Sequence, residues 1–152
     1  MAETFLTDKS RVLVDILTNA LVASPESNPE SPVTAVYGYR IFKILQPRMV
    51  VVDIWNHNIF QAVTGGEGRW LEFLIHVVVQ HKNTPKSLQE AAEQLNVIDT
   101  IIGNTLSSAE HRRNHEWQDL WFVRPTGRPP APKEYPNSRY SLTLLRMQID
   151  LN

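Results

Sequence analysis

The side chains best suited to chemistry are the histidines, because the chain of 152 residues contains no cysteine. His111 and His115 stand four residues apart, and on a helix this spacing could offer two imidazoles to one metal ion. Zinc needs at least a third ligand, yet the intervening residues are Arg, Arg and Asn, and cations beside a divalent metal are unfavourable. We therefore interpret residues 111–115 as a solvated loop or helix end, and we expect no metal and no cofactor.

The other histidines also lack partners for catalysis. His57 stands in the string Trp-Asn-His-Asn, which resembles part of a metal-dependent nuclease site but has no accompanying ligands. We expect a histidine at a strand end, bonded to solvent or backbone. His76 and His81 fall on opposite faces of one predicted strand, so they cannot pair within it, and His76 is expected on an exposed or interface face. No serine lies in a G-x-S-x-G elbow. The sequence thus predicts no catalytic residues and no enzyme.

Glycines cluster in the segment Gly65-Gly66-Glu67-Gly68, which could be mistaken for a phosphate-binding loop. The segment lacks the lysine and the Ser or Thr of a P-loop, and it leads into a predicted strand instead of a helix. A turn between strands is therefore the better interpretation. Because loops at strand ends can meet partners, Gly65, Gly66 and Gly68 are candidate interface residues.

A basic, proline-rich loop follows near the carboxyl end. It contains four basic residues and one acidic residue, Glu134. The basic residues are also candidate interface residues: Arg124, Arg128, Lys133 and Arg139. Such a loop could bind an acidic protein surface or a nucleic acid, or it could simply keep the chain soluble. The ten arginines and four tryptophans favour protein–protein contacts, where both residue types are enriched.

Hydrophobic periodicity predicts the elements that must carry these residues. Strict alternation places Leu71, Phe73, Ile75, Val77 and Val79 on one face of a long strand. Apolar residues at helical spacing predict two amphipathic helices, over 7–22 and 85–102. Strands are predicted over 36–46, 48–56, 69–82, 117–124 and 139–151.

Local signals set the boundaries of these elements. Thr7 and Asn83-Thr84-Pro85 are the predicted helix starts, and Gly103-Asn104 is a predicted stop. Gln46-Pro47 predicts a hairpin turn between the first two strands. In the last strand the apolar residues change face at Leu144-Leu145, which indicates a bulge or a change of packing partner. Proline-rich loops are expected over 24–35 and 124–139.

Strands that group together, instead of alternating strictly with helices, predict an α+β fold with a mainly antiparallel β-sheet and two helices packed on one face. With 42% hydrophobic residues and a net charge of −1, we expect one domain spanning 1–152. The amino-terminal segment lacks a basic region followed by a continuous apolar run, so we expect no signal peptide, and no apolar stretch is long enough to span a bilayer. Direct binding of nucleic acid is not expected from this near-neutral charge.

The chain order resembles the tail terminator, or tail completion, family of long-tailed bacteriophages. The resemblance rests on the order of the elements: the first helix, the proline-rich loop, a long hairpin, the Gly-rich turn, the long strand 69–82, the Thr84-Pro85 helix, a polar segment and the terminal Tyr140–Leu144 strand. It implies a non-enzymatic virion protein of the tail or neck, assembled in the host bacterial cytoplasm. Such a protein forms a hexameric ring on the tail tube protein, ends tube polymerisation and meets a head-side neck or connector protein. The contacts would come from residues 24–32, 65–68 and the arginines of 124–139.

Two alternatives stay open. One is a neck, head-closure or other tail adaptor protein of the same general build. The other is a small metal-dependent enzyme that uses His57, His111 or His115. Metal analysis of the purified protein separates the enzyme from the two structural interpretations.

Overall fold

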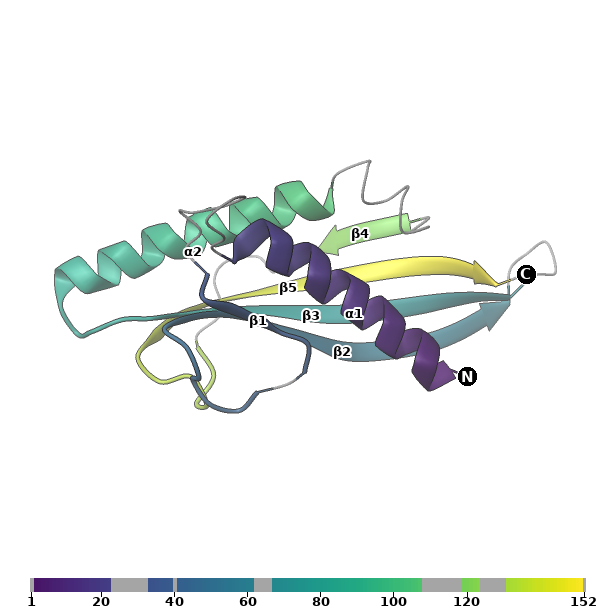
Figure 1. Ribbon diagram of the computed structural model, residues 1–152, viewed down its shortest axis with the longest axis horizontal. Helices are drawn as coiled ribbons and strands as arrows, with labels where there is room; N and C mark the ends of the chain where they lie inside the picture. Colours follow the sequence, from purple (N-terminus) through teal and green to yellow (C-terminus); the bar gives the residue numbers. More distant parts are fainter. Residues whose placement is uncertain are drawn as a thin grey trace.

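The computed structural model describes residues 2–22, 33–39, 41–61, 67–107, 119–123 and 131–151 (Figure 1). The elements follow the chain in the order α1 (Ala2–Leu21), β1 (Ala35–Tyr37), β2 (Arg48–Gln61), β3 (Glu67–Gln80), α2 (Pro85–Leu106), β4 (Asp119–Val123) and β5 (Ser138–Leu151). Five strands form one sheet in the order β1-β2-β3-β5-β4, in which β1 and β2 are parallel and the other neighbours are antiparallel. The predicted α+β fold with a mainly antiparallel sheet is confirmed.

Both helices cover the same face of the sheet. α1 packs on β1 and β2, α2 packs on β3 and β5, and the helices contact each other. In Figure 1 α2 runs above the strands and α1 crosses in front of them, while β2, β3 and β5 run side by side. Alternate residues of β2 and β3 point into this layer, as the alternation of β3 predicts. The main core contains Leu13, Leu17, Val50, Val52, Phe73, Ile75, Val77, Leu95, Ile98, Ile102 and Leu145, among others.

The opposite face of the sheet carries a smaller, more polar cluster. Its buried members are Ile41, Met49, Val51, Val78, Tyr135 and Tyr140. They are covered by two loops, 38–47 and 131–137, instead of by helices. The loop between β1 and β2 lies below the strands in Figure 1, whereas α2 lies above them. The two faces therefore differ in what covers them.

Both helices extend beyond their predicted bounds. α1 begins at Ala2, so Thr7 lies inside the helix and does not cap it. Ala and Glu, which stand at the start of this helix, favour helical structure. α2 starts as predicted, with Thr84 as N-cap and Pro85 in the first turn, but it continues through Gly103 to Leu106. Leu106 is fully buried, and this burial outweighs the cost of about 1 kcal/mol for glycine in a helix.

The predicted hairpin between 36–46 and 48–56 is wrong. β1 contains only Ala35–Tyr37 and pairs with β2 in parallel, and the described residues 38–39 and 41–47 lie in a loop. Ile41 and Ile44 pack against the sheet face, and this packing replaces the pairing that a strand would make. The antiparallel partner of β2 is β3, the next strand along the chain.

Two details of the strands go beyond the sequence prediction, one in β5 and one in β2. β5 pairs with β3 in continuous register from Ser138 to Leu151, so the switch at Leu144-Leu145 is a change of packing partner and not a bulge. Leu145 belongs to the main core, whereas Leu142 packs in the opposite cluster. The irregularity of the sheet lies in β2, where the register with β3 shifts between Ile54 and Asn56.

Candidate interaction surface

The largest exposed apolar side chains of the described residues gather on one loop. Tyr39, Phe42 and Leu45 are 64%, 68% and 40% exposed, and all belong to residues 38–39 and 41–47, here called the apolar loop. Large apolar side chains exposed together often mark a site of protein association. The loop is therefore the strongest candidate for an interaction surface.

The apolar loop is held from beneath. Ile41 is buried and Ile44 is partly buried, and both pack in the cluster that contains Tyr135. The Tyr135 hydroxyl donates a hydrogen bond to the carbonyl oxygen of Ile41. Since Ile41 and Ile44 point inward, the side chains of Phe42 and Leu45 are left on the outside. A loop anchored in this way loses little conformational freedom when it binds.

Both ends of the apolar loop are also tied to the body. The amide of Gln80 donates to the carbonyl of Pro47 over 2.7 Å, which fixes the end of the loop to β3. At the start of the loop, a Cβ added to Gly38 would stand 3.0 Å from Val14 Cγ2 of α1. Glycine therefore lets the backbone pass close to the helix. The rings of Tyr37 and Tyr39 meet edge to face with centroids 6.2 Å apart.

His76 lies under this surface and not on it. The prediction of an exposed or interface position is wrong, because only 5% of His76 is exposed. Its Nδ1 atom is hydrogen-bonded to the Tyr140 hydroxyl, and the Tyr140 ring lies 6.1 Å from that of Tyr135. A buried polar group needs such a partner, and the pair helps to define the cluster that carries the loop.

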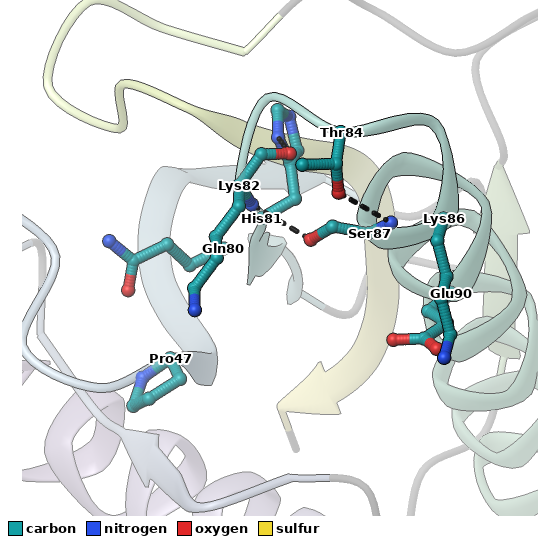
Figure 2. Close-up of a pocket in the computed structure, with 8 residues that line it drawn as sticks. All are labelled: Pro47, Gln80, His81, Lys82, Thr84, Lys86, Ser87 and Glu90. Carbon is teal, nitrogen blue, oxygen red and sulfur yellow. Dashed lines mark hydrogen bonds between the residues drawn. The ribbon is translucent and has the colours of Figure 1, made fainter.

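A cavity of about 570 Å³ lies between the end of the apolar loop and the start of α2 (Figure 2). Its lining residues are Pro47, Gln80, His81, Lys82, Thr84, Lys86, Ser87 and Glu90. Much of its polar lining serves the helix cap: Ser87 N–H donates to Thr84 Oγ1 over 3.2 Å, and Lys82 N–H donates to Ser87 Oγ over 2.8 Å. His81 Nδ1 lies 3.2 Å from the carbonyl oxygen of Lys82. These contacts order the turn between β3 and α2.

The structure places three of the predicted interface residues. Gly68 lies inside β3, where it pairs with Phe60 and Asp150, so its assignment to the turn is wrong. Lys133 and Arg139 are exposed, in the loop 131–137 and at the start of β5. The remaining interface candidates fall outside the described residues, namely Gly65, Gly66, Arg124 and Arg128, as does the loop 24–32.

Of the histidines proposed for metal binding, only His57 is in a described strand. Its backbone pairs with Leu71 within β2 and β3. His111 and His115 lie outside the described residues. Within the described part of the chain, no group of three His, Asp or Glu side chains could hold a metal ion. In that same part, no helix combines the length and the apolar character of a membrane span.

The sequence prediction missed the apolar loop because it assigned these residues to a strand. One signal could have found it: between Val33 and Val52 the chain has no acidic residue, but it has basic and large apolar ones. A second signal is the three-residue spacing of Tyr39, Phe42 and Leu45, which does not fit a strand. A comparison with protein-family models finds no match, and a comparison with curated proteins finds no significant relative.

Proposed function

We propose that the chain is a structural protein of a long-tailed bacteriophage that forms a ring on the end of the tail tube. In this role it ends polymerisation of the tube protein and offers a surface to the head-side connector. Assembly would take place in the bacterial cytoplasm, and the protein would stay in the virion tail or neck. It would act by binding alone, as a hexameric ring, without a cofactor.

The observation that carries the proposal is the anchored yet exposed apolar loop. Tyr39 and Phe42 are each more than half exposed, although Ile41 between them is buried. Truncating aromatic side chains at the centre of protein interfaces often costs more than 2 kcal/mol of binding energy. A loop of this kind is suited to a ring protein, whose work consists of contacts with its own copies and with the rings above and below.

The architecture also supports the proposal. Part of the order on which the resemblance rests is present, because α1 and α2 lie on one face of a mixed sheet that contains the long strand β3 and the terminal strand β5. The hairpin expected before β3 at 36–56 is replaced by the short parallel strand β1. Basic side chains lie near the apolar loop, with Lys43 inside it and Lys133 on the loop 131–137 that packs against it. Interfaces between proteins commonly surround an apolar centre with polar and charged residues.

Light scattering after size-exclusion chromatography, with and without purified tail tubes, tests this function. We expect a closed oligomer of several copies, formed by the protein alone or on the tubes, that co-purifies with the tubes. Binding to the connector but not to the tubes would favour the neck or adaptor alternative instead. A strict monomer at high concentration that binds neither partner would contradict the proposal.

A further inference from the structure

Three segments meet at one end of the sheet, where β3 ends and where β2 and β5 begin. The amide of Gln80 in β3 donates to the carbonyl of Pro47 in the apolar loop, and the amide of His81 donates to the carbonyl of Asn137 over 2.9 Å. A shared cluster on the sheet also joins the apolar loop to the loop before β5. The three segments form one surface, here called the loop end, which consists of the apolar loop, residues 81–90 and residues 131–139.

Positive charge is concentrated at the loop end. Five exposed basic side chains belong to it, namely Lys43, Lys82, Lys86, Lys133 and Arg139. Its acidic residues are Glu90 and Glu134. Because the whole chain carries a net charge of −1, the excess of basic residues here is a local feature and not a property of the composition. A surface of this kind attracts an anionic partner.

The cavity of Figure 2 lies within the loop end, directly beside the exposed apolar side chains. Pro47 forms part of its wall, and the exposed Leu45 stands two residues earlier, so their Cα atoms lie within about 8 Å. Figure 2 shows Lys82 beyond the end of β3, and Lys86 with Glu90 on α2. The charges of Lys86 and Glu90 offset each other, because the two residues lie one turn apart on the helix. Lys82 therefore supplies the remaining positive charge of the cavity.

Glu90 and the apolar loop together indicate which kind of anionic partner fits. A nucleic acid carries a phosphate at every nucleotide, and a strand along the loop end would place phosphates beside the Glu90 carboxylate. A peptide separates its carboxylates and offers backbone N–H groups, which a carboxylate can accept. A peptide can also supply apolar side chains to cover Phe42 and Leu45, as the centre of a protein interface does. The loop end thus fits an acidic peptide better than a nucleic acid.

We propose that the loop end binds an acidic, partly apolar segment of a partner protein. An acidic side chain of the segment enters the cavity beside Lys82, and neighbouring apolar side chains pack on Leu45 and Phe42. Lys43 and Lys133 stand around this contact and attract the segment as it approaches. The inference rests on the proposed function, in which the apolar loop meets another virion protein, and it adds the chemistry of that protein.

Fluorescence anisotropy with a labelled peptide tests this binding. The probe is a short peptide in which Glu alternates with Leu and Phe. One matched control peptide carries Gln in place of every Glu, and another carries Ser in place of every Leu and Phe. We expect the probe to bind with a Kd below about 1 mM at low salt, and each control to bind at least about fivefold more weakly. Added salt should weaken binding of the probe, because the lysines are exposed.

Substitutions in the protein locate the bound peptide. Lys82→Glu should weaken binding of the probe about fivefold, since it places like charges together in the cavity. Leu45→Ser should weaken it by a similar factor through the loss of apolar contact. The matched controls are Arg11→Glu, at an exposed position of α1, and Val97→Ser, at a half-exposed position of α2. Neither control should change the affinity, and all four variants should keep the circular dichroism spectrum of the natural chain.

Several outcomes would overturn the proposal. Tighter binding of oligothymidylate or of phosphatidylserine vesicles than of the probe, at the same salt, would assign the loop end to a nucleic acid or to a membrane. A probe that does not bind, or that binds equally well to Lys82→Glu and Leu45→Ser, would also overturn it. In each case the ring function stands if the natural chain still caps tail tubes. A chain that binds the probe as expected but never associates with tail tubes would overturn the ring function alone.

Discussion

The two faces of the sheet use the same strands for different purposes. On the helical face, Phe73, Ile75 and Val77 are fully buried under α1 and α2. On the opposite face, β2 and β3 pack against loops through a cluster that includes Tyr135 and Tyr140. The helical face is closed and mainly apolar, and its buried Ser141 hydroxyl donates to Asp99 of α2. The opposite face instead supports a loop with exposed aromatic side chains. One face therefore stabilises the fold, and the other presents a surface.

The largest loss of stability should follow from truncating a buried side chain on the helical face. Phe73 is fully buried in the main core, at the centre of β3. Phe73→Ala removes most of its contacts and should lower the free energy of unfolding by about 3 to 5 kcal/mol. Urea denaturation followed by circular dichroism measures this change. A loss below about 1 kcal/mol would mean that the helical face is not the main source of stability.

A smaller loss of stability should follow from a substitution on the opposite face. Tyr135→Phe removes the hydroxyl that donates to the carbonyl of Ile41 and leaves that carbonyl without this donor. We expect a loss of about 1 to 2 kcal/mol in the free energy of unfolding. Amide hydrogen exchange should also become faster in residues 41–47, while the helical face stays protected. Tyr39→Phe, at an exposed ring, is the control and should change neither quantity.

The N-cap of α2, beside the cavity, should stabilise the fold by the amount typical of a helix cap. Thr84 Oγ1 accepts from the amide of Ser87, and Thr84→Ala removes this bond. The free energy of unfolding should fall by about 1 kcal/mol, whereas Thr84→Ser should keep most of it. Thermal unfolding measures both variants. Equal losses in the two variants would show that the hydroxyl is not the source of the stabilisation.

The smallest effect on stability should come from the apolar loop itself. Phe42 is 68% exposed, so Phe42→Ser should change the free energy of unfolding by less than about 0.5 kcal/mol. Thermal unfolding of dilute, monomeric protein measures this change. A loss like that of Phe73→Ala would place Phe42 among the residues that hold the fold, and the distinction between the two faces would fail.

The sequence predicts the helical face well because burial imposes a strict period. The alternation from Leu71 to Val79 and the Thr84-Pro85 helix start are both local signals. The helix start is confirmed, and so is the alternation from Phe73 to Val79. The local signal Gly103-Asn104 predicts that α2 ends before Gly103. The helix continues because Leu106 is buried in the core, and this burial is not visible in the local sequence. Tertiary burial decides where that helix ends.

The interaction surface is harder to predict from the sequence. Residues 36–46 are rich in β-branched and aromatic residues. This composition suits a strand and an anchored loop equally, so it does not distinguish between them. Ile41 is buried and Phe42 is exposed because only Ile41 packs in the cluster on the sheet face opposite the helices. Tyr135, which is distant in the sequence, completes that cluster. Exposure of the loop is thus a product of long-range packing, which no window of the sequence contains.

Growth of tail tubes in the presence of this protein tests the central claim most directly. Purified tube protein is allowed to polymerise with the natural chain or with Phe42→Ser, and tube lengths and ends are measured by electron microscopy. We predict that the natural protein stops growth and forms a ring at one end, and that Phe42→Ser does so far less, although it is equally folded. Tubes that grow equally long with and without the natural protein would contradict the account.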